Sequence, residues 1–138
     1  MINIVVNSDS KYSINKLAIQ GAVLEILQQS SLAGDFEIGV SIVGDRKMHE
    51  FNKKYRGIDS PTNILSFALE DSVSQAQLQH VPKVGFVKSP NKVTYLGDIL
   101  ISYPMVVKDA ALEGVTVEQE LLFLVQHGTK HLLGIHHE

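Results

Sequence analysis

The chain has 138 residues, of which 44% are hydrophobic and 20% are charged, and its formal net charge is −3. This length and composition suit one folded domain over residues 1–138. The sequence contains no cysteine, which excludes disulfides and thiolate metal sites, so a bound metal must be held by His, Asp or Glu. The negative charge excludes a general attraction to nucleic acid, and RNA binding would need a local basic patch.

The sequence gives no sign of a membrane segment. No apolar run approaches the roughly 20 residues that a membrane helix needs, and the N-terminal residues lack the basic start and long apolar stretch of a secretory signal. We therefore expect a cytoplasmic protein with no membrane partner.

The first elements in the chain are a strand, a helix and a second strand. Residues 2–7 form a short β-rich run that ends in turn residues. Apolar residues between 17 and 27 then recur at helical spacing, and either Ser13 or Asn15 can cap this helix. Residues 36–43 alternate and are β-branched, which predicts the second strand.

A short charged helix and a third strand follow. Asp45 is expected to cap a helix over residues 46–55, with Lys53 and Lys54 on its solvent-exposed side. Turn residues then lead into a strand at 64–70.

The next part of the chain predicts a long loop, a strand and a helix. Residues 71–92 show only a weak periodicity of apolar residues, which predicts a surface loop. Residues 93–102 predict a fourth strand, Pro104 suits the first turn of a helix, and Gly114 is expected to end that helix.

The last predicted helix spans residues 117–133. Thr116 and Gln119 form a capping box at its start, and Gly134 suits a left-handed residue after its end. Strands with intervening helices predict an α+β fold, in which helices pack on a mixed sheet with mostly parallel strands.

Four of the six histidines lie in the last twelve residues, HGTKHLLGIHHE. His127 and His131 are four apart on the predicted helix, so they differ by about 40° in direction and about 6 Å in height. Gly134 lets the chain reverse, and a third histidine can then close the coordination: His137, with His136 as its rival. Three imidazoles leave a fourth position for water, as in a catalytic zinc site. Such a pair also occurs on ordinary helix surfaces, but the helix–Gly–His arrangement favours a metal.

Three segments together resemble a known family. HGTKHLLGIHH is similar to the H-G-x-x-H-x-x-G-x-D-H signature of the YbeY endoribonucleases, bacterial zinc-dependent proteins of rRNA maturation. Residues 55–67, YRGIDSPTNILSF, resemble the family's Arg-containing loop and the strand after it, and residues 95–102, YLGDILIS, resemble its Gly-Asp-Ile strand. The order and spacing of the three agree over most of the chain.

The resemblance implies a metalloprotease-like HxxxH helix in an α+β domain and one Zn²⁺ per chain, held by His127, His131 and His137. It also implies a functionally important Arg56. The implied activity is single-strand-specific cleavage of RNA, rather than DNA, in 16S rRNA 3′-end maturation and ribosome quality control. The implied partner is the ribosome or a ribosomal protein, in the cytoplasm.

The sequence departs from the family pattern at two points. His136 stands where the family has an Asp, which can orient a neighbouring ligand, and His136 can instead compete as a ligand. The chain also ends at Glu138, where family members usually continue into a further helix, so we expect a shortened form or a looser metal site.

A phosphodiester is the substrate that these residues favour. Gly128 stands where the H-E-x-x-H peptidases have their general base, which disfavours a peptidase, and we expect it to leave room for a phosphate beside the metal. Zinc can lower the pKa of bound water to about 7 and polarise a phosphoryl oxygen. Arg56 is expected to grip the phosphate bidentately across a cleft, the alternative being a surface ion pair with Asp59. Lys53 and Lys54 are expected to steer RNA or to form a solvated helix face.

Other candidates carry weaker signals. Tyr55, Phe67 and Phe86 can stack on bases, although a core position is the simpler expectation for Phe67, and Asp98 can serve near the metal. Two other functions stay open: a metallohydrolase of another substrate, including peptides, and a non-catalytic ribosome-assembly factor with structural zinc.

Overall fold

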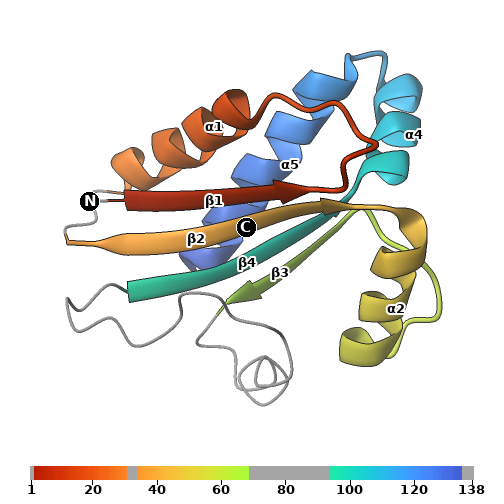
Figure 1. The fold of residues 1–138 in the computed structure, drawn as a ribbon, viewed down its shortest axis with the longest axis horizontal. Coiled ribbons are helices and arrows are strands. Elements are labelled where there is room, and N and C mark those ends of the chain that lie inside the picture. Colours follow the sequence, from red (N-terminus) through yellow and green to blue (C-terminus); the bar gives the residue numbers. More distant parts are fainter. Residues whose placement is uncertain (1, 31–33, 69–93, 135–138) are drawn as a thin grey trace.

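The computed structural model of the chain describes residues 2–30, 34–68 and 94–134. The described strands are β1 (Ile2–Ser8), β2 (Phe36–Val43), β3 (Ile64–Ala68) and β4 (Thr94–Ser102). They form one sheet in the order β1-β2-β4-β3. β1, β2 and β4 run parallel, whereas β3 is antiparallel to β4 (Figure 1). The predicted α+β fold with a mixed, mostly parallel sheet is therefore confirmed.

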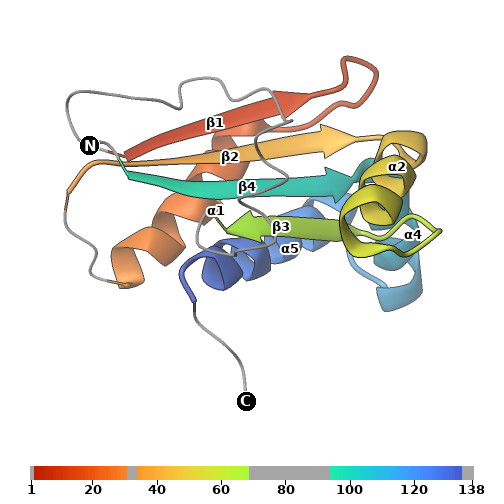
Figure 2. The ribbon, with the colours of Figure 1, turned by 90° about the horizontal axis from the view of Figure 1, so that it is seen from below.

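Helices cover both faces of this sheet. α1 (Lys16–Gln29) and α5 (Val117–Leu132) pack on one face, and α2 (Asp45–Arg56) packs on the other (Figures 1 and 2). α4 (Tyr103–Glu113) follows β4 directly and leads into α5. None of the helices in the described ranges is long and apolar enough to cross a membrane.

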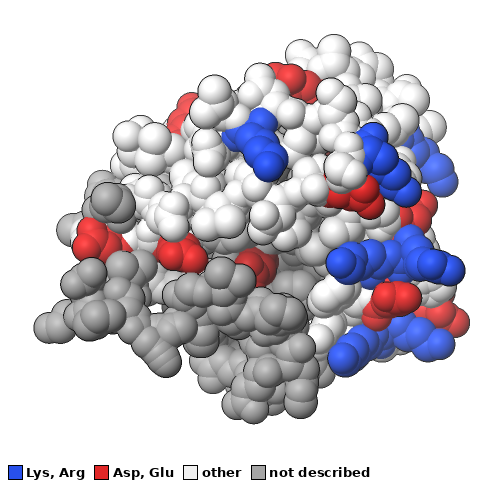
Figure 3. Space-filling view, viewed as in Figure 1, with Lys and Arg blue, Asp and Glu red and all other residues white. Residues whose placement is uncertain are grey.

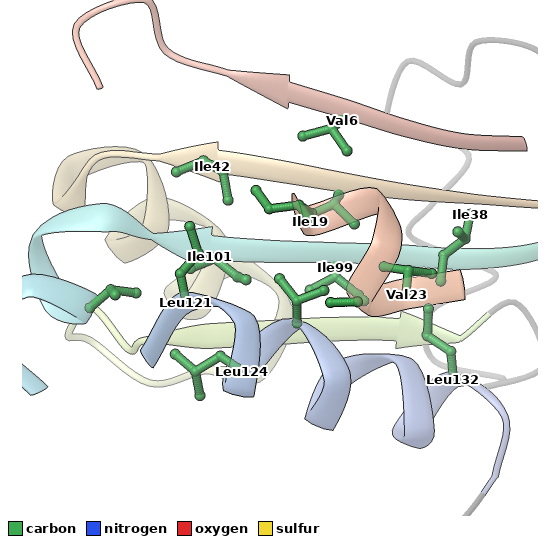
Figure 4. Close-up of a cluster of buried hydrophobic side chains, with 14 of the residues drawn as sticks. Val6, Ile19, Val23, Ile38, Ile42, Ile99, Ile101, Leu121, Leu124 and Leu132 are labelled. Atoms are coloured by element: carbon green, nitrogen blue, oxygen red, sulfur yellow. The ribbon is translucent and has the colours of Figure 1, made fainter. Parts of the chain in front are cut away.

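The two faces of the sheet belong to two different hydrophobic clusters. In β4, Ile99 and Ile101 enter the large cluster under α1 and α5, whereas Leu100 enters the smaller cluster under α2. This alternation follows from the two-residue repeat of a strand. Figure 4 shows side chains of the large cluster, which come from β1, β2, β4, α1 and α5.

Most of the predicted helix ends are observed. Of the two cap candidates, Asn15 and not Ser13 caps α1, and its side chain accepts a hydrogen bond from the Ala18 amide at 3.1 Å. Thr116 and Gln119 form both bonds of the capping box at the start of α5. Gly114 ends α4 in the left-handed region, with φ of 72°.

The prediction that Asp45 caps α2 is wrong. Gly44 holds the N-cap position without a side-chain hydrogen bond, and Asp45 is the first helical residue. Its carboxylate instead accepts a hydrogen bond at 2.7 Å from the hydroxyl of Ser102, which is fully buried and needs a partner. The predicted loop at 71–92 lies outside the described residues.

Candidate metal and RNA site

Two of the three predicted metal ligands lie on one exposed side of α5. His127 and His131 are a single turn apart and both are exposed, and the same side carries Phe123 one turn earlier. Gln126 lies on another side of the helix, where its amide donates to the Ala22 carbonyl oxygen of α1 at 3.1 Å. The Phe123–His127–His131 side of α5 is exposed.

Gly128 lies on a neighbouring side of α5, which packs directly on the sheet. A Cβ atom at this position would lie 3.1 Å from Ile64 Cδ1, 3.1 Å from Ser66 Oγ and 3.2 Å from Ile99 Cδ1. These separations are shorter than the roughly 3.5–4.0 Å of ordinary carbon contacts. Gly128 thus allows close packing of the helix on β3 and β4, and a larger residue would need these side chains to shift.

The expectation that Gly128 leaves room for a phosphate is consequently wrong. Gly128 is buried against the sheet, whereas the two histidines are exposed. The absent side chain makes room for the sheet, and not for a substrate.

Gly97 of β4 has a similar role where the last turn of α5 meets the sheet. It adopts φ of +140°, and a Cβ there would run into the Phe67 carbonyl oxygen and lie 2.9 Å from Cδ2 of Leu132 in α5. The glycine therefore lets the last turn of α5, which carries His131, settle on β4.

The donors that the structure describes fit a zinc site in part. His127 and His131 offer two imidazole nitrogens from one side of the helix, which is the ligand type that zinc accepts. Among the described residues, no three His, Cys, Asp or Glu side chains come together as a complete metal site. The predicted third ligand His137 and its rival His136 lie outside the described residues. Gly134 ends the helix with φ of 77°, so the chain turns at this point.

Arg56 is the last residue of α2, in the most basic helix of the described chain. α2 contains five Lys or Arg residues and two acidic residues, and Lys53, Lys54 and Arg56 lie in its last turn. All three are exposed. Figure 3 shows Lys and Arg side chains gathered over the part of the surface where α2 lies. Although the whole chain is acidic, this end of the molecule offers the local basic patch that RNA binding requires.

The loop after Arg56 is anchored back onto α2. The Asn52 amide is buried and donates to the Ser60 carbonyl oxygen at 2.7 Å. His49 Nε2 lies 2.7 Å from Asp59 Oδ1. The hydrogen bond with His49, followed by the charge of Lys53, holds the pKa of Asp59 below its ordinary value.

Asp59 is thus not the partner of Arg56. Within the part of the chain that the structure describes, the ion pairs of Asp59 are with His49 and with Lys53, at 2.7 and 4.0 Å. The alternative of an Arg56–Asp59 surface pair is therefore wrong.

Arg56 and the two histidines approach the same edge of the sheet from opposite faces. α2 packs through Met48 and Phe51 on the face of Leu65 and Leu100, whereas α5 packs on the other face. β3, at one end of the described sheet, lies between the two helices (Figure 2). A ligand that reached both Arg56 and the histidines would have to pass the β3 edge.

The structure places the candidates Tyr55, Phe67 and Asp98 away from the two histidines of α5. The ring of Tyr55 packs against Phe51 and Phe67, with centroids 5.4 and 5.6 Å apart, and Phe67 joins the core as expected. Asp98 pairs with Phe67 across the strands and accepts a hydrogen bond from Tyr95. This places Asp98 on the face opposite to α5, which speaks against a role beside His127 or His131. Phe86 lies outside the described residues.

Sequence reasoning missed Phe123. Its side chain is 62% exposed, and its ring lies 6.4 Å from the His127 ring, centroid to centroid, at 20° between the planes. The signal was present, because an aromatic residue four positions before His127 falls on the same side of the helix as the histidine.

Comparisons with known proteins agree on one family. The family model described as Endoribonuclease YbeY matches residues 4–138. The Endoribonuclease YbeY of Roseiflexus castenholzii is 42% identical over 125 residues, which are 91% of this chain and 72% of that protein. The Endoribonuclease YbeY of Shouchella clausii is 40% identical over 139 aligned residues, 99% of this chain and 83% of that protein.

A solved structure has a similar fold. The solution structure of TM1509 from Thermotoga maritima aligns with a TM-score of 0.58 and 26% sequence identity, covering 98% of this chain and 75% of that one. The sequence match spans nearly the whole chain and includes the histidine helix and the Arg56 segment. The chain therefore belongs to the family of YbeY endoribonucleases.

Proposed function

We propose that the protein is a zinc-dependent endoribonuclease that cuts single-stranded RNA. The observation that carries this proposal is the exposed His127–His131 pair on α5, in a chain of an endoribonuclease family. We further propose that it acts in the cytoplasm, in 16S rRNA 3′-end maturation and ribosome quality control, with the ribosome or a ribosomal protein as its partner.

In this proposal one zinc ion is held by His127, His131 and His137. Bound zinc supplies a water whose pKa is lowered to about 7 and a Lewis acid for a phosphoryl oxygen. The chain's contribution is to hold the ligands in place. Gly128 and Gly97 let α5 sit directly on the sheet, so the two histidines project from a helix that has little freedom to shift.

Arg56 binds the RNA backbone. A guanidinium can donate two parallel hydrogen bonds to phosphate oxygens and stabilise the charge that develops on phosphorus. Lys53 and Lys54 add positive charge beside it, which attracts the RNA and positions its backbone. Since Arg56 and the histidines lie on opposite faces next to β3, the bound strand runs across the β3 edge.

A peptidase is disfavoured by the same geometry. The position that carries the general base in the H-E-x-x-H peptidases is Gly128 here, and it faces Ile64, Ser66 and Ile99 of the sheet. A carboxylate at that position would be buried in the sheet contact and would not reach a substrate.

The test compares RNA and casein as substrates of the zinc-loaded protein. We expect cleavage of single-stranded RNA, little cleavage of duplex RNA and no cleavage of casein. Arg56→Ala should lower kcat/KM by about 10²-fold or more, as loss of one donor to a developing oxyanion does. Arg46→Ala removes the same kind of side chain from the exposed first turn of α2 and serves as the matched control.

Full activity of Arg56→Ala would refute the role of this arginine. Metal-loaded protein that binds ribosomal RNA but never cuts it would refute the endoribonuclease and leave an assembly factor with structural zinc.

A further inference from the structure

Phe123 is an apolar side chain in an unusual position. It lies at the middle of α5, 62% exposed, whereas Leu124 and Val125 beside it are buried in the core. An isolated exposed apolar residue needs no explanation by itself. Phe123 is set apart by its neighbour, because its ring lies beside the imidazole of the proposed zinc ligand His127.

The Phe123 ring stacks on the His127 ring, with 20° between their planes and 6.4 Å between their centroids, and most of the Phe123 side chain stays exposed. A flat aromatic face that is open to solvent is the feature on which single-stranded RNA bases stack. Among the described residues, the candidates Tyr55 and Phe67 lack this openness, since the Tyr55 ring packs against Phe51 and Phe67.

A positive charge accompanies this surface. Lys130 lies three residues after His127 and seven after Phe123, which are the helical spacings of one side. It is one of the two basic residues in the last turn of the helix. A base on Phe123 would therefore have an ammonium group within the next two turns of α5, at a distance that a phosphate of the same strand can reach.

We propose that Phe123 and Lys130 form a nucleotide subsite on α5, next to the metal ligands. The base of an unpaired nucleotide stacks on the Phe123 ring, and Lys130 binds a neighbouring phosphate. Bases in a duplex are already stacked on each other and cannot offer a free face. The subsite thus gives the enzyme a preference for single strands with little preference for base identity. This inference rests on the proposed function, because it assigns the substrate contacts of the same site.

The test measures binding of a single-stranded RNA oligonucleotide that contains 2-aminopurine, whose fluorescence falls when the base stacks. Phe123→Leu keeps the apolar volume and removes the aromatic face, and Phe123→Tyr keeps the face. Lys130→Gln removes the charge. Two exposed residues of α4 serve as matched controls, through Leu112→Ala and Lys108→Gln.

We expect Phe123→Leu to weaken binding by about 5- to 150-fold, as loss of one base–aromatic stack does, and to abolish the fluorescence change. Phe123→Tyr should bind like the wild type. Lys130→Gln should reduce the slope of log K against log salt concentration by about 0.7, as loss of one phosphate contact on a single strand does. The α4 controls should leave both quantities unchanged.

Unchanged affinity and fluorescence in Phe123→Leu would overturn the subsite. So would zinc loss in this variant by elemental analysis, because Phe123 would then act only through His127. A change in oligomeric state by sedimentation would also overturn it, because a second copy of the chain would then cover the ring. Wild-type protein that binds RNA through Phe123 but fails to cut it would refute the proposed function and leave the subsite standing.

Discussion

Replacing Gly128 by alanine tests whether the histidine helix is held against the sheet. In a helix interior, alanine is favoured over glycine by about 1 kcal/mol. The new Cβ, however, would meet Ile64, Ser66 and Ile99 at 3.1–3.2 Å, and Ile99 is fully buried and cannot retreat. Overpacking of this kind costs about 1–3 kcal/mol. We therefore expect Gly128→Ala to lower the free energy of unfolding by up to about 2 kcal/mol.

Gly21→Ala in α1 is the matched control. It gains the same helix propensity, and a Cβ at position 21 has no atom within 4 Å. This variant should be stabilised by about 1 kcal/mol, so the two variants should differ by the packing cost of about 1–3 kcal/mol.

Urea unfolding followed by far-ultraviolet circular dichroism gives both free energies, provided that the m-value stays unchanged. If Gly128→Ala were as stabilising as Gly21→Ala, the close contact between α5 and β3 would not exist. The account of how His127 and His131 are positioned would then fail.

Two further predictions concern α2 and the buried carboxyl of α5. Asn52→Ala removes the amide that donates to the Ser60 carbonyl oxygen, and we expect the free energy of unfolding to fall by about 1–3 kcal/mol. We also expect a lower kcat/KM toward RNA, because the segment after Arg56 loses this anchor. Unchanged stability in a urea titration would contradict this prediction. Burial, together with a hydrogen bond and repulsion from Glu113, raises the pKa of Glu120 above its ordinary value. The folded state therefore favours the protonated carboxyl. Its stability falls as the pH rises from the ordinary pKa of the unfolded chain through the raised pKa of the folded state. Glu120→Gln should therefore unfold at a higher temperature than the wild type at pH 7, and the difference in unfolding temperature should be smaller at pH 4. An equal difference in unfolding temperature at both pH values would refute the raised pKa.

Local signals in the sequence predicted what depends on local physics. The Asn15 cap and the Thr116–Gln119 capping box involve residues three apart, and the structure contains both. The alternation of 36–43 correctly predicted a strand. The four-residue spacing of His127 and His131 correctly put both on one side of a helix.

The sequence did not predict contacts between residues that are far apart in the chain. Asp45 meets Ser102, 57 positions away, and nothing near Asp45 indicates that its carboxylate is used there. Gly128 was read as space for a substrate, because the sequence does not tell which side of α5 touches β3. Asp59 has the residue type to pair with Arg56, but the geometry of α2 brings it to His49 instead.

The exposed ring of Phe123 was missed for a different reason. Apolar residues on an amphipathic helix are expected to face the core, although the four-residue spacing to His127 puts Phe123 on the exposed side of α5.

The central claim is that imidazoles of α5 hold a metal ion, and metal content measures it most directly. Elemental analysis of the purified wild type should find one equivalent of zinc per chain, and His131→Ala should lose it. His49→Ala removes a histidine of α2 that pairs with Asp59, and this variant should keep its zinc. A wild type without metal, or a His131→Ala variant that retains its full zinc content, would contradict the account.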